Sequence, residues 1–238
     1  MTRGGLRVEG GEDGVSGERR HIREAYDEAL RRLEEDVVRI GSLAGDLIHR
    51  AVEALKRQDV HAAEAVIAED DVVDRLHLDL EERVARLLAT QQPMAGDLRA
   101  LMSVLAISID LERLADHAEG IAKATKRLSR EPLLKPLVDI PYMERLVQEM
   151  LQDALQAFVR RDAALAESLA QKDDVVDALR SQVFRELITY MVEDPRTISR
   201  ALDLILVAQH LERAADHVTN VAERVVYMVT GELRELNV

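Results

Sequence analysis

The sequence of 238 residues contains two copies of one acidic motif, placed one hundred positions apart. LERLADH spans Leu111 to His117, and LERAADH spans Leu211 to His217. A second element, DDVVD, also occurs twice, at Asp70 to Asp74 and at Asp173 to Asp177. An internal repeat of this length predicts two copies of one structural unit. A recurring set of carboxylates indicates a functional site, unless the duplication is too recent for the two copies to have diverged in sequence.

Composition and periodicity both favour an all-α fold. Hydrophobic residues make up 47% of the chain but aromatic residues only 3%, a balance typical of helical bundles rather than sheets. Between Tyr26 and Leu55 the apolar residues recur every three or four positions, as on one face of a helix. Three such helices with short connections would cover one another's apolar stripes as a bundle.

Capping residues and prolines predict where the six helices begin and end. Asp59 is expected to cap the second helix, Pro93 to open a third that runs to about Arg127, and Asp194 with Pro195 to open the last. The fifth helix is expected to span Asp162 to Val192. We therefore predict a disordered Gly-rich tail at 1–18, a three-helix repeat at 19–128, a Pro-containing linker at 129–141, a second three-helix repeat at 142–232 and a C-terminal tail at 233–238.

The overall charge and composition argue against several functional classes. The formal net charge of −13 opposes binding to the phosphates of nucleic acid. The chain has no cysteine, which excludes disulfides and thiolate metal ligands and favours the interior of a cell. No stretch approaches the roughly 20 apolar residues of a membrane span, and Met1 to Gly17 lacks the apolar run of a signal peptide. We expect a cytoplasmic protein that neither inserts into a membrane nor binds nucleic acid.

The repeated acids take positions where a helical wheel expects core residues. Glu112 and Asp116 continue one edge of the apolar face of the third helix, as Glu212 and Asp216 do on the last. Asp70 and Asp173 likewise interrupt apolar stripes on the second helix of each repeat. Carboxylates four residues apart repel, and burying one without a partner costs several kcal/mol.

Three kinds of compensation could stabilise such acids. The first is a groove open to solvent, or pairing with Arg99, Arg113, Arg200 or Arg213, although the wheel turns Arg113 and Arg213 away from the neighbouring glutamates and toward other helices. The second is protonation of one acid in a crowded pair, which raises its pKa. The third is a metal ion held between facing helices.

For a metal, clustered carboxylate oxygens favour hard or borderline cations such as Mg²⁺, Mn²⁺ or iron, as single ions or as multinuclear sites. Zinc is disfavoured because the chain has no cysteine and few histidines. His117 and His217 lie off the line of the acids, so we expect them to form interhelical hydrogen bonds or to lie at the surface. The predicted ligands are Asp70, Asp74, Glu112, Asp116, Asp173, Asp177, Glu212 and Asp216.

The alternative function is a carboxylate-bridged metalloenzyme on a helical bundle. Di-iron bundles of that class carry Glu-x-x-His on two helices. Here Glu-x-x-His occurs at Glu18 and His21, beside the tail, and the near match of Asp74 with His77 has Arg180 in the equivalent place of the second repeat. The chain also lacks a phosphate-gripping glycine-rich loop and a nucleophile–base pair, so we expect no enzymatic activity.

With LERLADHAEGIAK and LERAADHVTNVAER on equivalent helices, the chain from about Arg19 to Glu232 closely resembles the PhoU family of phosphate-uptake regulators. In that family an E(D)xxxD signature occurs in each of two three-helix units, matched here by Glu112 with Asp116 and by Glu212 with Asp216. The resemblance implies a pseudo-twofold pair of bundles, and acidic motifs that bind iron or other divalent metals in some members.

The resemblance also implies a role in phosphate signalling. Members act as negative regulators at the cytoplasmic face of the Pst phosphate transporter, where the expected partners are a PstB-like ATPase and a PhoR-like sensor histidine kinase. A homodimer is a further candidate assembly. The repeats differ at one outer position, where Glu119 of the first becomes Thr219 of the second, and Gly120 becomes Asn220. The outer ligands are therefore expected to differ between the repeats.

Overall fold

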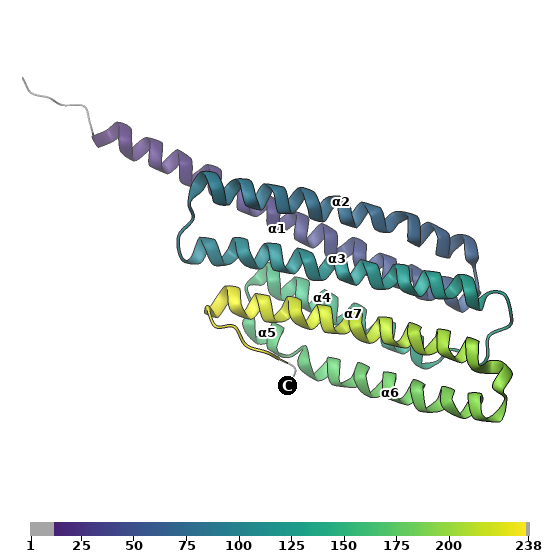
Figure 1. Ribbon diagram of the computed structural model, residues 1–238. Helices are drawn as coiled ribbons and strands as arrows, with labels where there is room; N and C mark the ends of the chain where they lie inside the picture. Colours follow the sequence, from purple (N-terminus) through teal and green to yellow (C-terminus); the bar gives the residue numbers. More distant parts are fainter. Residues whose placement is uncertain (1–11, 237–238) are drawn as a thin grey trace, which may run out of the picture.

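The computed structural model describes residues 12–236, with side chains from Arg23 onward (Figure 1). In the first bundle, α1 (Glu12–Arg57), α2 (Val60–Gln91) and α3 (Gly96–Leu128) run back and forth along one another. Of the tail predicted at 1–18, residues 1–11 lie outside the described part, and α1 already begins at Glu12. The helix therefore extends into the segment that we predicted, from its glycines, to be a disordered tail.

The second bundle follows the same plan with one additional break. It consists of α4 (Asp139–Arg160), the short α5 (Ala163–Glu167), α6 (Ala170–Glu193) and α7 (Ile198–Thr230), with the 3₁₀ turn η1 (Pro195–Thr197) before α7. The six long helices and their grouping into two three-helix bundles confirm the all-α fold predicted from the sequence. None of the described helices is both long enough and apolar enough to cross a bilayer.

The two bundles meet mainly along α3 and α7, which lie side by side and antiparallel at the centre of the molecule (Figure 1). In the same view α2 lies along one edge and α6 along the opposite edge. A second contact joins α1 to α4, where Gly41 and Gly45 face Leu155 and Leu151. A Cβ at Gly41 or Gly45 would lie 2.8 Å from a leucine methyl, so these glycines allow the close approach of the two helices.

The predicted caps at Asp59 and Asp194 are confirmed. The Asp59 carboxylate accepts a hydrogen bond from the Ala62 backbone N–H at 3.0 Å, at the start of α2. The Asp194 carboxylate accepts from the Arg196 N–H at 3.0 Å and opens η1, with Pro195 in its first turn. Each cap satisfies an N–H that the first turn of a helix leaves without an internal partner.

The helix predicted over Asp162 to Val192 is interrupted at Ser168 and Leu169. Asp162 caps α5 by accepting from the Leu165 N–H at 3.0 Å, but the Ser168 hydroxyl then donates to the Leu165 carbonyl at 2.7 Å. Such local side-chain bonds compete with the helical ladder. Leu169 is fully buried, so the bend directs it into the core.

Two boundaries predicted from prolines are wrong by a few residues. Pro93 was expected in the first turn of the third helix, but α3 begins at Gly96, after Ala95 adopts a positive φ of 42°. Pro141 was assigned to the linker but lies in the first turn of α4. Proline is tolerated there because the first N–H groups of a helix have no internal acceptor.

Candidate metal centre

The acids of the first repeat come together between α2 and α3. We call Asp70, Asp74, Glu112 and Asp116 the first acidic cluster. Asp70 lies in the buried stripe of α2 with Val66 and Val73 and is only 8% exposed. Asp74, one turn further along α2, and the two acids of α3 are half-buried. The prediction that Asp70 interrupts the apolar stripe of α2 is therefore confirmed, whereas Glu112 and Asp116 lie at the edge of the core of α3 rather than within it.

The crowding of the first acidic cluster disfavours full ionisation. Burial raises the pKa of Asp70 to about 7, and the negative charges of Asp74 and Asp116 add to this shift. Burial, with the charge of Asp116, also raises the pKa of Asp74 and that of Glu112. Buried carboxylates near like charges hold their protons more tightly. The cluster is thus a site that gains from a positive counter-charge.

The acids of the second repeat form a similar group between α6 and α7. We call Asp173, Asp177, Glu212 and Asp216 the second acidic cluster. Asp173 lies in the buried stripe of α6 and is 1% exposed, whereas Asp177 is exposed at the edge. Glu212 and Asp216 on α7 are half-buried. The second acidic cluster is therefore more open at its outer α6 acid than the first acidic cluster.

The α7 acids show the same electrostatic response. Burial raises the pKa of Glu212, with a further contribution from the charge of Asp216. Burial also raises the pKa of Asp216, against the opposing effect of Arg213 and with the support of Asp177. Since Asp177 acts on both α7 acids, the two helices bring their carboxylates within electrostatic range of one another.

Several oxygens of these carboxylates are buried without a hydrogen-bond partner: Asp70 Oδ1, Asp74 Oδ1 and Glu212 Oε2. An uncompensated buried charge costs several kcal/mol, so such atoms call for a proton or a cation. Oxygen ligands of this kind suit Mg²⁺, Mn²⁺ and iron. The donor set and its unsatisfied atoms therefore fit the hard cation expected from the sequence.

The described side chains do not by themselves close around an ion. Within residues 23–236 no three histidine or acidic side chains converge closely enough to form a metal-binding group. The acids of each pair of helices act on one another electrostatically, as Asp116 does on Asp74 and Asp177 on Glu212. Ligation by the predicted residues would therefore involve side-chain rotation or bridging water, as is common for Mg²⁺.

Arginine contributes more to the clusters than the helical wheel suggested. Arg113 Nη1 lies 2.9 Å from Asp116 Oδ2, and Arg113 Nε lies 3.4 Å from Glu112 Oε2. In the second repeat Arg213 Nη1 lies 3.7 Å from Asp216 Oδ2. The expectation that these arginines turn to other helices is wrong, because a long side chain reaches across the i to i+3 spacing. Both arginines are more than half exposed, so their pairing only partly offsets the acidic charge.

Comparison with known proteins agrees with this architecture. The profile of the family described as PhoU domain matches the chain twice, over residues 37–125 and 140–225. The chain belongs to the PhoU family. The resemblance predicted from the two E(D)xxxD motifs is thereby confirmed.

Relatives and solved structures of the PhoU family cover nearly the whole chain. The phosphate-specific transport system accessory protein PhoU homolog of Aquifex aeolicus is 46% identical over 204 residues, covering 86% of this chain and 92% of that protein. The crystal structure of PhoU from Pseudomonas aeruginosa has a TM-score of 0.84 at 38% identity, covering 87% of this chain and all of that one. PhoU from Streptococcus pneumoniae has a TM-score of 0.82 at 34% identity, covering 88% of this chain and 99% of that one.

Between the two acidic clusters of this PhoU-family chain lies a polar junction of α3 and α7. His117 Nδ1 lies 3.2 Å from His210 Nδ1, and His217 Nδ1 lies 3.0 Å from Asp110 Oδ1. The expectation of interhelical hydrogen bonds for His117 and His217 is confirmed. Burial lowers the pKa of His117 to about 4, with a smaller effect from the neighbouring His210. Burial also lowers the pKa of His210, so His117 and His210 join the bundles as neutral side chains near pH 7.

Sequence analysis did not identify the other members of this junction. Asn220 donates from Nδ2 to Asp110 Oδ1 at 3.1 Å, which places a second donor on the carboxylate that His217 contacts. Gly120, the equivalent of Asn220, provides room for His210, because a Cβ at Gly120 would lie 2.3 Å from the imidazole ring. The difference between Gly120 and Asn220 was visible in the repeat alignment and has this steric cause.

Substituting Gly120 is expected to weaken the α3–α7 junction. In Gly120→Ala the new methyl group would displace His210, and overpacking of this kind costs about 1–3 kcal/mol, partly offset by the better helix propensity of alanine. We expect a net loss in the free energy of unfolding, measured by urea denaturation. Gly96→Ala on the same helix is the control, because nothing lies within 4 Å of a Cβ at Gly96. Equal stability of the two variants would contradict the steric role.

Proposed function

We propose that this chain is a metal-binding regulator of phosphate uptake and phosphate signalling that acts through protein–protein contacts. The relatives named as phosphate-specific transport system accessory proteins support a role beside a phosphate transporter. The proposed partners are the transporter ATPase and its sensor histidine kinase, on the cytoplasmic side of the membrane, with the chain acting as a negative regulator. A homodimer is the proposed assembly.

The observation that carries the metal-binding part is the set of buried carboxylate oxygens without partners. Asp70, Asp74 and Glu212 each contribute one such atom. A divalent or trivalent ion would supply the missing positive charge and join α2 to α3, or α6 to α7. The eight acids of the two acidic clusters would hold one or more ions, with iron, Mn²⁺ or Mg²⁺ preferred to zinc. The ion would stabilise a surface rather than support turnover.

Exposed apolar side chains on α3 and α7 support the protein-contact part. Both helices carry them in the half that precedes the acidic motif: Leu98, Met102, Ile109, Ile198, Leu202 and Leu206, each between 41% and 50% exposed. Apolar groups gathered on exposed helix faces are typical of interaction sites. Since each group shares a helix with an acidic cluster, ion binding and partner contact would involve the same rigid elements.

Metal content provides the test of the proposal. In a variant that combines Glu112→Ala, Asp116→Ala, Glu212→Ala and Asp216→Ala, we expect at least a tenfold loss of bound metal, because ligands of both acidic clusters are removed. Elemental analysis of protein purified without added metal would measure it. The control combines Asp71→Ala with Asp174→Ala, which removes the exposed acid next to the buried one in each DDVVD copy.

Equal metal content in the quadruple variant and the wild type would contradict the proposal and favour a scaffold with solvated acids. Circular dichroism would establish that both variants remain helical. Robust hydrolysis of phosphate esters or ferroxidase activity that depends on Asp116 would instead support the metalloenzyme alternative.

A further inference from the structure

The helix α6 carries a line of apolar side chains on its exposed side. Phe184, Ile188 and Val192 follow one another at steps of four residues, which places them along one face of the helix. They are 42%, 40% and 78% exposed. The chain has 2 phenylalanines, and the other one, Phe158, is buried. An exposed aromatic ring within an apolar line is typical of a protein contact.

The fold itself does not require this line of apolar residues. When Asp173 to Asp177 is aligned with Asp70 to Asp74, the corresponding positions of α2 are Glu81, Ala85 and Ala89. In the first bundle α2 forms a regular helix with one charged and two small residues at these places. Single exposed apolar residues are normal, whereas a patch of them indicates a contact site. The second repeat therefore presents an apolar surface that the first repeat lacks.

The neighbouring helix α7 extends this line into a patch. Ile198, Leu202 and Leu206 also follow at steps of four residues, and each is between 41% and 50% exposed. The helices α6 and α7 lie side by side and antiparallel (Figure 1). The Thr197 hydroxyl donates to the Tyr190 carbonyl at 3.0 Å, so the start of α7 is held against the last turn of α6. We call the six exposed residues of the two lines the α6–α7 patch.

Both apolar lines lead into the second acidic cluster. At 100° per residue, Phe184 lies about 20° from Asp177 on the helical wheel of α6. On the wheel of α7, Ile198 lies in line with Asp216. Each helix therefore presents, on one side, apolar residues at one end and carboxylates at the other.

Negative charge predominates at the acidic end of the α6–α7 patch. The acids of the second acidic cluster are joined there by Asp174, which is exposed on α6. The cations that act on the α7 acids of this cluster are Arg180 and Arg213, so the carboxylates outnumber them. Asp174 lies outside the proposed set of metal ligands and keeps its charge when a cation is bound.

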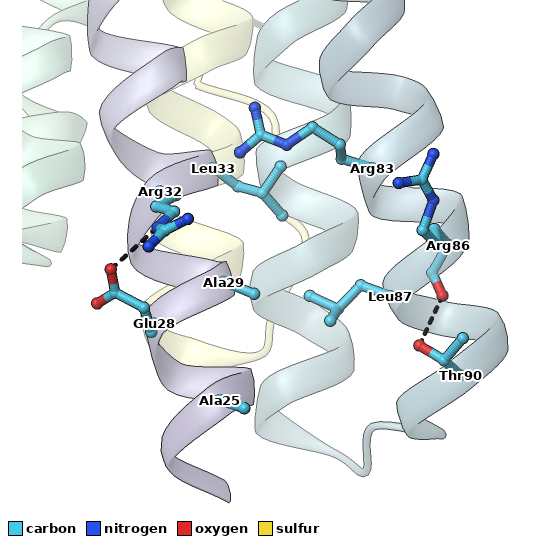
Figure 2. A pocket seen from close by; sticks show the side chains of 9 residues that line it. All are labelled: Ala25, Glu28, Ala29, Arg32, Leu33, Arg83, Arg86, Leu87 and Thr90. Carbon is cyan, nitrogen blue, oxygen red and sulfur yellow. Dashed lines mark hydrogen bonds and ion pairs between the residues drawn. The ribbon is translucent and has the colours of Figure 1, made fainter. Parts of the chain in front are cut away.

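A groove of about 450 Å³ between α1 and α2 has a rim of the opposite charge. Figure 2 shows Arg32, Arg83 and Arg86 around this groove, together with the apolar side chains of Ala29 and Leu87. A basic segment would meet guanidinium groups there, whereas it would meet carboxylates at the α6–α7 patch. Charge complementarity therefore directs a basic, partly apolar segment to the second bundle.

We propose that the α6–α7 patch binds an amphipathic helix of a partner protein, in which a line of apolar residues is followed by Lys or Arg. This inference rests on the proposed function, for which it names the surface and the chemistry of one partner. Apolar residues at steps of three or four are how a helix docks on such a surface. Since Phe184 and Asp177 lie about two turns apart, the basic residues are expected about two turns beyond the last apolar contact. An anionic lipid surface is disfavoured, because the acidic end would repel its headgroups.

The test uses a fluorescein-labelled helical peptide of about 20 residues, with Leu at three positions four residues apart and Lys in the next two turns. Fluorescence anisotropy with the full chain measures its affinity. In Phe184→Glu, which introduces the residue type that the first repeat has at Glu81, we expect binding to weaken at least about tenfold. Val159→Glu is the control, because Val159 is 65% exposed and lines a groove between α4 and α1. Its affinity is expected to stay within about twofold of the wild type.

A second pair of measurements tests the acidic end of the patch. A matched peptide with Glu in place of Lys is expected to bind the wild type at least about tenfold more weakly than the Lys peptide. In Asp174→Lys we expect this preference for the Lys peptide to decrease by about threefold or more. Circular dichroism would establish that the variants remain helical, as expected for substitutions at exposed positions.

Three results would overturn the proposal. The first is a wild-type chain that does not bind the Lys peptide or binds both peptides equally, and the second is equal affinity of Phe184→Glu and Val159→Glu for the Lys peptide. The third is cosedimentation with phosphatidylglycerol vesicles that is lost in Phe184→Glu, which would assign the patch to a membrane. Metal content is measured separately, so a failure of the proposed metal binding is distinguishable from each of these results.

Discussion

Asp70 is expected to make the metal-free protein more stable at pH 5 than at pH 8, by roughly 2–3 kcal/mol in the free energy of unfolding. Burial and the charges of Asp74 and Asp116 raise the pKa of Asp70 from 3.8 to about 7. Between these two values the folded chain keeps a proton that the unfolded chain has released. The contribution is therefore complete below pH 3.8 and is lost as the pH rises through about 7.

Two other groups limit the pH range in which this effect can be observed. The pKa of Glu28 is lowered to about 2 by its hydrogen bonds with Arg31 and Arg32, so its contribution changes only in more acidic solution. The pKa of His117 is lowered to about 4 by burial, which gives a slope of the opposite sign between that pH and about 6.5. A comparison of variants removes the histidine effect, since His117 is common to all of them.

Urea denaturation in the presence of a chelator, at several pH values from 5 to 8, would measure the effect. In Asp70→Asn the part of the pH dependence that comes from Asp70 is expected to disappear. Asp71→Asn should behave like the wild type, because Asp71 lies on the exposed side of α2. Added Mn²⁺ is expected to restore stability at pH 8. A pH-independent difference between Asp70→Asn and the wild type would contradict the assignment.

The largest loss of stability is expected from truncating a core residue next to the first acidic motif. Leu111 is fully buried on α3, and one of its methyl groups lies 3.4 Å from the position of a Cβ at Gly41 on α1. Replacing Leu111 by alanine leaves a cavity where three helices meet and is expected to cost about 2–5 kcal/mol. The midpoint of urea unfolding would fall accordingly.

Leu78→Ala is the control for the loss of the leucine side chain itself. Leu78 lies on α2 and is 60% exposed, so its removal should change the free energy of unfolding by less than about 0.5 kcal/mol. A loss in Leu111→Ala no larger than that in Leu78→Ala would show that α3 is not anchored through this residue.

The fold was largely predictable from the sequence because its signals are local. Apolar stripes with helical spacing indicated the long helices, and Asp59 and Asp194 marked two of their starts. The interruption at Ser168 was not predicted, because a single hydroxyl that bonds its own backbone leaves the apolar pattern unchanged. The position of Pro141 was also missed, since a proline in a first turn and one in a linker look alike in sequence.

The acidic clusters were partly predictable, and their surroundings were not. A helical wheel placed Glu112 and Glu212 on inward faces because it depends only on the helical repeat. It could not indicate the reach of Arg113, which depends on the length of a flexible side chain. Nor could it place Glu235 at a pocket that Asp216 also lines, because that proximity depends on how the chain turns after α7. Long-range proximity of this kind has no local signature.

The polar junction of α3 and α7 has a consequence for communication between the two bundles. His117 follows Asp116 directly, and His210 lies two residues before Glu212, so α3 and α7 touch within one turn of both acidic motifs. Movement of either helix on cation capture would be transmitted to its neighbour beside the other motif. A partner that contacts one half is therefore expected to sense the occupancy of both.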